Sequence, residues 1–375
     1  MNKEVVQRLL DGIETAWGSN FAPDIHETSG TSIDEETIEV SSPECLEAKP
    51  LVTVYMLAYN HGKYIRQAIE SVMNQKTNFP FELIIGEDCS PDNTREICLE
   101  LQKRFPKIIR VLYSKVNLGV RKNSRRMRKR VRGDYVAFCE GDDFWTSPCK
   151  LQKQIDLMRN DPTTAICYTD FSVFNEQTVI QEHNMLAKSG VFDKWSQLTR
   201  EDFISELFLG YNFFATASIV VNRKRWEEYL DENPTANRTF LLGDIVLRTE
   251  MAKRGSVQCV HEDMVTYRLN STGITQATGV LGAKFHLHNL YLKIYCISEV
   301  SDELFWKTID FTVKSGTYYF TENTERRDAW RKSLGVLAKN CPFKLICLRF
   351  FILFLICLLP PKMSYFAFRV FRRLW

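Results

Sequence analysis

The run Val52-Thr53-Val54-Tyr55-Met56-Leu57-Ala58, followed directly by Tyr59-Asn60-His61-Gly62, decides the fold of this chain. A short apolar, β-branched segment that stops at polar and turn-forming residues is typical of a buried strand. Strand-like and helix-like segments then alternate along the chain: strands at 82–87, 108–113 and 135–139, and helices at 64–75, 93–104 and 121–132. Alternation at this spacing predicts βαβ units and an α/β fold, with a mostly parallel central sheet flanked by helices.

The same pattern continues through the second half and then becomes helical. Further strands are expected at 165–169, 218–222 and 257–260, a helix at 240–254, and helices beyond residue 282. We therefore divide the chain into four parts: an N-terminal extension at 1–49, the α/β domain at 50–275, a helical region at 276–340 and an apolar, basic tail at 341–375.

Polar residues follow the predicted strands at the points where these strands end. The second strand ends in Glu87-Asp88-Cys89-Ser90-Pro91-Asp92-Asn93-Thr94, and the fourth ends in Glu140-Gly141-Asp142-Asp143-Phe144-Trp145. Ligands of open α/β sheets bind beyond the carboxyl ends of the strands, so the chemistry is expected there. Clustered carboxylates repel one another, and hard oxygen ligands suit Mg²⁺ or Mn²⁺ as the compensating cation. No cysteine and histidine set has zinc spacing, and neither GxxxxGK[ST] nor GxGxxG follows a strand.

Taken together, these strand ends resemble family 2 glycosyltransferases of the GT-A fold, of the bacterial cell-envelope type. The resemblance covers roughly residues 50 to 275. It is strengthened by several smaller matches in the expected order: Asn117-Leu118-Gly119 with Asn123, Lys150-Leu151 with Gln154, Gly243-Asp244 with Gly255, and Tyr267-Arg268.

The resemblance implies a role for each of these positions. The nucleotide of the donor would bind at Tyr59, Asn60, Glu87, Asp88, Asn117 and Asp142. Asp143 would be the principal metal ligand, with Asp142 and Glu140 beside it. Asp244 stands at the position of the catalytic base. Arg268, Asn270 and Lys150 are possible contacts of the diphosphate or the acceptor. Glu140 replaces the more frequent Asp of the metal motif, and Asn270 replaces a frequent His.

The implied reaction is an inverting transfer of a sugar from a nucleotide-diphosphate sugar to a hydroxyl of a glycan or lipid-linked acceptor. The alternative is a catalytically silent GT-A domain that acts as a membrane-bound scaffold. A nucleotidyltransferase would show a glycine-rich loop after the first strand, which is absent here. Three simpler interpretations stay open: Asp142 and Asp143 as a helix N-cap pair, Asp244 as a cap residue, and Ser90-Pro91-Asp92 as a turn.

Charge and composition exclude some partners. The chain has 375 residues, 45% hydrophobic and 25% charged, and a net charge of +3, which gives no reason to expect nucleic acid binding. Eight basic residues lie between Arg121 and Arg132, without the interleaved aromatic residues that single-stranded nucleic acid would require. That run is either a solvated helix face or a surface for anionic lipid or an acidic acceptor.

The apolar tail predicts contact with a membrane surface. Leu345 to Leu359 is apolar apart from Arg349, and a helix of this length is about 22 Å long, too short for the hydrocarbon core of roughly 30 Å. Aromatic residues alternate with arginines from Tyr365 to Trp375, which suits in-plane association. The alternative is a buried helix. The scattered cysteines and the polar N-terminus favour a cytoplasmic protein, peripheral on the cytoplasmic face of the plasma (inner) membrane.

Overall fold

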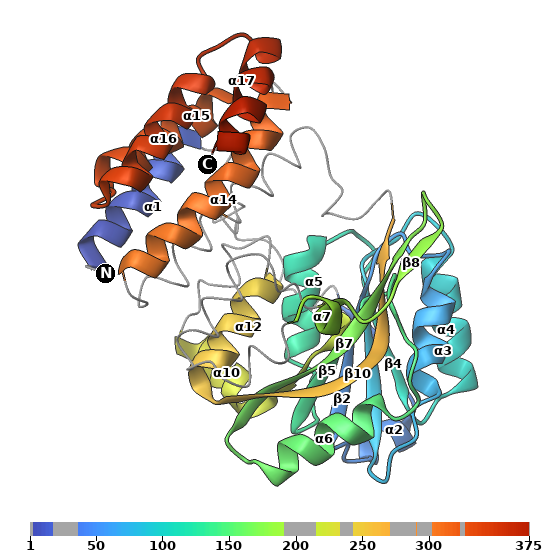
Figure 1. Ribbon diagram of the computed structural model, residues 1–375. Helices are drawn as coiled ribbons and strands as arrows, with labels where there is room; N and C mark the ends of the chain where they lie inside the picture. The colour runs from blue at the N-terminus through green and yellow to red at the C-terminus, as the bar shows by residue number, and fades with distance from the viewer. Residues whose placement is uncertain are drawn as a thin grey trace.

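The computed structural model describes residues 3–17, 37–190, 215–232, 243–270, 290, 302–322 and 327–374. Within this part of the chain, an α/β domain is built on a ten-stranded sheet, and five helices form a bundle beside it (Figure 1). The sheet order is β1-β4-β3-β2-β5-β9-β7-β10-β6, with β8 paired to β7. The strands are β1 (Ile38–Val40), β2 (Val52–Ala58), β3 (Phe81–Glu87), β4 (Ile109–Tyr113), β5 (Tyr135–Phe138), β6 (Phe144–Trp145), β7 (Thr164–Asn175), β8 (Ile180–Glu182), β9 (Val220–Asn222) and β10 (Ser256–Leu269).

The predicted parallel core is confirmed. Strands β4, β3, β2 and β5 lie side by side and parallel, with Val54 opposite both Leu83 and Ala137. Beyond β5 the sheet becomes mixed, because β9 runs antiparallel between β5 and β7, whereas β10 returns parallel to β7. The carboxyl ends of β2 and β3 therefore meet at one edge, which brings their polar residues together.

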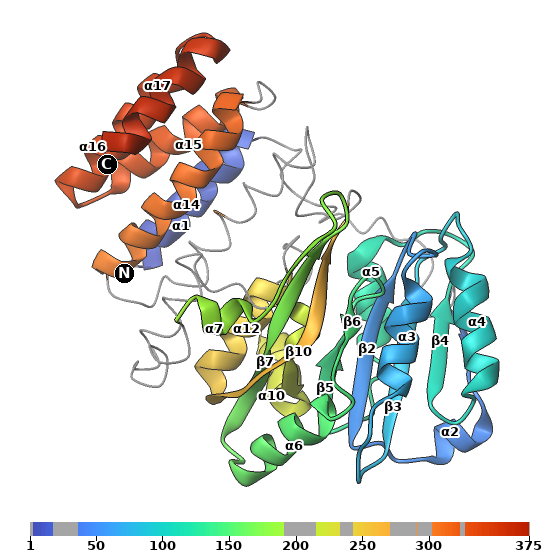
Figure 2. The ribbon, with the colours of Figure 1, turned by 45° about the vertical axis from the view of Figure 1, so that its right-hand side comes forward.

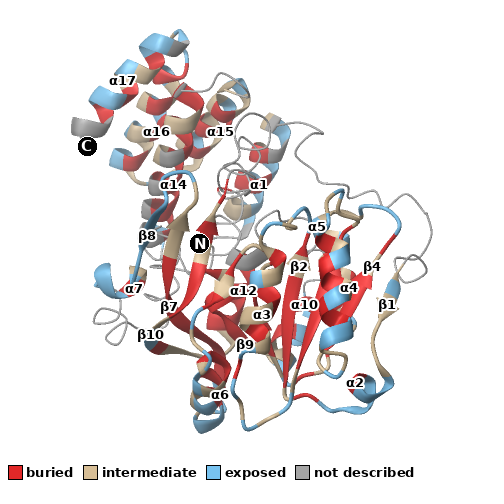
Figure 3. Cartoon of the chain, turned by 90° about the vertical axis from the view of Figure 1, so that its right-hand side faces the viewer, coloured by how far each residue is buried: buried red, intermediate tan, exposed pale blue. Residues whose placement is uncertain are grey.

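Helices cover both faces of this sheet (Figure 2). They are α2 (Pro43–Glu47), α3 (Ile65–Met73), α4 (Thr94–Arg104), α5 (Gly119–Arg128), α6 (Lys150–Asn160), α7 (Met185–Lys188), α10 (Arg223–Glu232) and α12 (Gly243–Arg254). α3 packs against α4 on one face. On the other face, the Tyr55 hydroxyl donates to Ser124 O of α5 (2.5 Å), and its ring meets Trp226 of α10 edge-on. The strands between these layers are the most buried part of the domain (Figure 3).

The sheet extends N-terminal to the boundary predicted at residue 50. β1 pairs antiparallel with β4, Glu39 lying opposite Leu112. Arg110 holds this edge, because its guanidinium donates to Glu39 (2.8 Å) and to the buried Glu82 (3.1 Å). The charge of Glu82 is further compensated by Arg132. A buried carboxylate is tolerated only when it is paired in this way.

The N-terminal helix belongs to the same bundle as the C-terminal helices. The bundle contains α1 (Lys3–Trp17), α14 (Asp302–Glu322), α15 (Arg327–Asn340), α16 (Lys344–Ile356) and α17 (Pro361–Leu374). α1 lies along α15, where a side chain at Gly12 would collide with Val336. Arg349, the single charge within the apolar run 345–359, turns inward and pairs with Asp310 of α14 at 2.8 Å. Within the described residues, no helix has both the length and the apolarity needed to cross a bilayer.

Candidate active site at the carboxyl ends of the strands

The acidic loop, Glu140 to Asp143, follows β5 and is held by the far end of β10. Asp143 is buried, and its Oδ1 accepts a 2.8 Å hydrogen bond from the backbone N–H of Arg268. Asp142 accepts a 2.9 Å bond at Oδ2 from the side-chain amide of Asn270. The antiparallel pairing of β6 with β10 brings these segments together, although 125 positions separate Asp143 from Arg268. The structure thus places both Asp residues beside two of the predicted diphosphate or acceptor contacts.

Negative charge is concentrated in this loop. Burial raises the pKa of the Asp143 carboxyl well above its usual range, and the nearby Asp142 and Glu140 raise this pKa further. Within the described residues, no three His, Cys, Asp or Glu side chains form a metal cage. Mg²⁺ typically uses only one or two protein carboxylates and completes its shell with water and substrate phosphates. Asp142 and Asp143 are adjacent carboxylates whose negative charges repel each other, and a bound cation would relieve that repulsion. They therefore fit a site of that kind.

Arg268 has its own partners in this structure. Its Nε donates to the backbone oxygen of Asp142 (2.9 Å), and its Nη2 donates to Gln67 Oε1 (2.8 Å). The guanidinium lies 4.9 Å from the ring centre of Tyr64, and Nη1 is 3.9 Å from Glu176. A buried guanidinium bound in this way positions the acidic loop. Sequence reasoning missed Gln67, Tyr64 and Glu176, which belong to no motif.

We expect Arg268→Lys to raise the apparent KM for Mn²⁺ about ten-fold, because lysine keeps the charge but cannot make both fork contacts. Steady-state rates over a Mn²⁺ titration measure this change. Arg223→Lys, which alters an exposed ion pair with Glu227, is the matched control. An unchanged Mn²⁺ dependence in Arg268→Lys would show that the acidic loop does not need this clamp.

The predicted nucleotide residues are brought together at the ends of β2, β3 and β4. Tyr59 follows β2 with 47% of its surface exposed, and Asn60 beside it is also exposed. Asp88 is buried, and its Oδ1 accepts a 2.8 Å bond from the backbone N–H of Leu118. Asn117 donates its side-chain amide to Asp88 O at 3.0 Å. Burial raises the pKa of Asp88. An exposed aromatic ring near an oriented carboxyl can hold a base by stacking and hydrogen bonding.

Glu87 has a structural position. Its carboxylate is fully buried and accepts hydrogen bonds from Ser90 N and Arg95 Nε, each at 2.6 Å. Arg126 of the basic run is also buried and donates to Glu87 O at 2.5 Å. Predicting the basic run as a uniformly solvated face is therefore wrong at Arg126. These contacts shape the strand end from inside and favour a supporting role for Glu87 beneath the nucleotide residues.

The loop after β3 fixes the loop after β2, as the turn interpretation of Ser90-Pro91-Asp92 anticipates in part. The backbone N–H groups of Asn60, His61 and Gly62 donate to Ser90 Oγ (3.0 Å), Thr94 Oγ1 (2.8 Å) and Asp92 Oδ2 (2.8 Å). Asn60 adopts a left-handed conformation with φ of 57°. Three bonds holding a conformation that costs energy indicate a preorganised loop.

Lys150 lies in the interior. It is fully buried, its Nζ donates to Gln154 Oε1 at 2.8 Å, and it lies 4.3 Å from the ring centre of Trp145. Gln154 also donates to Cys167 O and Ser218 O, so it links α6 to two neighbouring segments. Burial lowers the pKa of Lys150 to about 7. This placement favours a structural role over contact with the diphosphate.

Asp244 lies in the first turn of α12, but its side chain lies outside the described residues, so its role stays a prediction. His61 lies in the loop after β2. Its Nε2 is 3.9 Å from Asp142 Oδ2, and its ring packs so closely that a side chain at Gly141 would collide with it. His61 therefore connects the loop after β2, which holds Tyr59 and Asn60, to the acidic loop.

Residues 53–229 match the family model described as Glycosyl transferase family 2. This segment is a glycosyltransferase family 2 domain. The family 2 domain is 33% identical over 223 residues to an uncharacterized protein of Mycobacterium tuberculosis, a match that spans 60% of each chain. It is 27% identical over 232 residues to the putative teichuronic acid biosynthesis glycosyltransferase TuaG of Bacillus subtilis, over 60% of this chain and 82% of TuaG.

The fold agrees with that membership. The structure of S. aureus TarS residues 1–349 in complex with UDP-GlcNAc matches with a TM-score of 0.57, at 15% identity, over 85% of this chain and 89% of TarS 1–349. At that identity the match supports the GT-A-like fold of the family 2 domain, which confirms the predicted fold class.

Proposed function

We propose that this protein is a glycosyltransferase that moves a sugar from a nucleotide-diphosphate sugar to a hydroxyl of a cell-surface glycan, with inversion at the anomeric carbon. The observation that carries the proposal is the meeting of Asp142 and Asp143 with Arg268 and Asn270 at the strand ends. Family membership, the teichuronic acid assignment of TuaG and the UDP-GlcNAc complex of TarS support it.

In the proposed site, Tyr59 stacks on the base, while Asp88 accepts from it and Asn60 and Asn117 frame the ribose. Asp143 and Asp142 would hold a divalent cation, Mg²⁺ or Mn²⁺, with Glu140 nearby. When bound, such a cation neutralises the donor diphosphate and makes it a better leaving group. Arg268 and Asn270 keep the two carboxyls of the acidic loop oriented toward that position.

Asp244 is the proposed general base. It removes the proton of the acceptor hydroxyl as that oxygen forms a bond to the anomeric carbon and the bond to the diphosphate oxygen breaks. Attack opposite the leaving group inverts the anomeric centre in a single displacement. Proton NMR of the first product formed tests this step directly. The anomeric configuration should be opposite to that of the donor, and retention would refute the single displacement.

For the donor, we expect Asp88→Asn to raise KM by about ten- to a hundred-fold with a smaller change in kcat. Asparagine can still accept from Leu118 N, but it presents an N–H in place of an oxygen toward the base, and a hydrogen bond to a charged group contributes about 1.5–3 kcal/mol. Donor titrations measure the change, with the exposed Asp134→Asn as the control. An unchanged KM would remove Asp88 from the nucleotide site.

We also propose that the protein works at the cytoplasmic face of the plasma (inner) membrane on a glycan or lipid-linked acceptor. The support comes from the exposed apolar side chains of the last two helices. Of the fifteen large hydrophobic residues that are exposed among the described residues, eight lie between Leu345 and Val370. Apolar side chains exposed on helices beside basic ones suit binding in the plane of a membrane surface.

The alternative of a silent scaffold makes an opposite prediction for the same site. A scaffold requires neither a metal-dependent donor site nor turnover, so the native protein and Asp143→Ala would behave alike in donor hydrolysis and transfer. A difference between them supports the enzyme.

A further inference from the structure

The last two helices combine exposed apolar side chains with one sign of charge. The final 47 residues, Ala329 to Trp375, contain nine basic residues and no acidic residue. Arg349 is turned inward to Asp310, so it does not interrupt the outer face of α16. The exposed apolar residues of this surface are Leu345, Leu348, Phe351, Leu355, Leu358, Met363, Phe366 and Val370.

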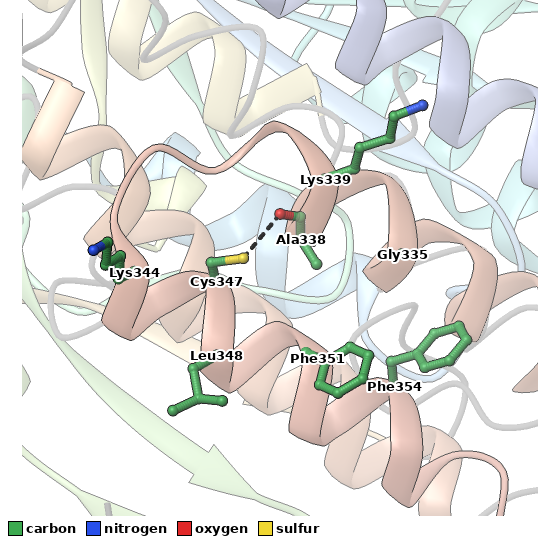
Figure 4. A pocket seen from close by; sticks show the side chains of 8 residues that line it. All are labelled: Gly335, Ala338, Lys339, Lys344, Cys347, Leu348, Phe351 and Phe354. Carbon is green, nitrogen blue, oxygen red and sulfur yellow. Dashed lines mark hydrogen bonds between the residues drawn. The ribbon is translucent and has the colours of Figure 1, made fainter.

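A trough opens on this surface between α15 and α16 (Figure 4). Its volume is about 600 Å³. Small residues, Gly335 and Ala338, lie on the α15 side, and the rings of Phe351 and Phe354 stand parallel at 6.4 Å on the α16 side. Cys347 Sγ is directed to Ala338 O at 3.0 Å, so the one polar side-chain atom in the middle of the trough has a partner. The remaining polar side chains that line it are Lys339 and Lys344.

The apolar walls and the two lysines of this lining indicate the kind of ligand that it can bind. Apolar walls without unpaired donors or acceptors suit a hydrocarbon chain and give a peptide backbone nothing to bind. The two ammonium groups, in a segment without acids, attract an anionic headgroup. A bilayer with anionic lipids offers both features at the same place, which a soluble peptide does not.

We propose that the trough between α15 and α16 is a lipid site, which takes one hydrocarbon chain of an anionic membrane lipid, while Lys339 and Lys344 at its two ends attract anionic headgroups. The inference rests on the proposed membrane contact and goes further, because it requires a chain to enter the protein. Surface adsorption alone requires only exposed apolar area.

Substitutions at Gly335 distinguish entry of a lipid chain into the trough from adsorption at the surface. A methyl group there would lie 3.8 Å from Phe354, an ordinary contact, so Gly335→Ala fits, whereas the ring of Gly335→Phe would fill the trough. Both changes favour a helix more than glycine does, so the bundle should still fold. Gly335→Phe also adds apolar surface, which would strengthen simple adsorption.

The test is co-sedimentation of the full chain with vesicles of phosphatidylcholine alone and of equal parts phosphatidylcholine and phosphatidylglycerol. We expect binding to the anionic vesicles, about ten-fold weaker for Gly335→Phe and unchanged for Gly335→Ala, since two or three methylene groups lose their site. Reversing both rim charges with Lys339→Glu and Lys344→Glu should abolish the preference for anionic vesicles. Release of nucleotide from the donor without vesicles should be the same in all variants.

The results of these experiments distinguish a lipid site from simple membrane contact and from a contact between two copies of the chain. If Gly335→Phe binds like the native chain, the trough is not a lipid site and only surface contact remains. If the native chain binds neither vesicle, the membrane contact and the trough both fail, while donor turnover still tests the transferase. If the native chain is a dimer in solution that Gly335→Phe dissociates, the trough is a contact between two copies, and the proposal is overturned.

Discussion

Asp143→Asn is expected to lower kcat/KM for transfer by a factor on the order of 10³. Lewis-acid stabilisation of the leaving diphosphate contributes several kcal/mol, and each 1.36 kcal/mol is ten-fold in rate. Asparagine keeps the shape of the side chain and the acceptor for Arg268 N, so the loss reports the charge rather than a collapsed loop. Steady-state rates of nucleotide release at saturating Mn²⁺ measure the effect.

Thermal unfolding separates loss of the metal site from loss of the fold. The pKa of Asp143 is raised by burial, Asp142 and Glu140, so its ionised form destabilises the apo protein at neutral pH. The apo variant should therefore unfold at no lower temperature than the native protein. Mn²⁺ with nucleotide should stabilise only the native chain. Asp156→Asn, an exposed carboxyl on α6, is the control and should change neither quantity. A variant with native kcat/KM would exclude Asp143 as a metal ligand.

Asp244→Asn is expected to lower kcat by about 10²- to 10⁴-fold, the usual contribution of a general base. Because the proposed role begins only when the acceptor attacks, the donor affinity and the stabilisation by Mn²⁺ should stay near native values. The acid limb of the profile of kcat against pH should disappear with the base. Rates over a range of pH and calorimetric donor titrations measure both sides of this prediction.

Asp231→Asn on the neighbouring α10 is the control for that substitution, since this carboxyl is exposed. A kcat for Asp244→Asn within a few-fold of native would assign the base to another group. A loss of donor affinity as large as the loss of kcat would instead place Asp244 in the donor site.

The parallel core could be predicted from the sequence because apolar residues dominate each of its strands and helix-patterned segments separate them. The strand expected at 52–58 is observed at Val52–Ala58, and that at 82–87 at Phe81–Glu87. The mixed half was harder to predict. β9 is three residues long and β6 two, and their pairing depends on long-range contacts that leave no local pattern.

Site residues could be predicted from the sequence where they directly follow a strand. They were harder to predict where a side chain is either buried or directed to the site. Asp88 and the Asp142-Asp143 pair lie where the strand ends predict. Glu87 and Lys150 resemble ligands in the sequence, yet the interior holds both, through Arg95 and Gln154 respectively. A charged residue can point to either face of its element, and periodicity in a short segment does not decide which. The partners of Arg268 come from three separate segments of the chain, so no single motif contains them.

The strand ends are proposed to form a metal-dependent donor site. The most direct test is the release of nucleoside diphosphate from a panel of nucleotide sugars, with Mn²⁺ and with a chelator, for the native protein and Asp143→Asn. We predict that one nucleotide supports release, that the chelator abolishes it and that the substitution lowers it on the order of 10³-fold. Equal release with and without metal, or no release from any donor by the folded protein, would contradict a metal-dependent donor site.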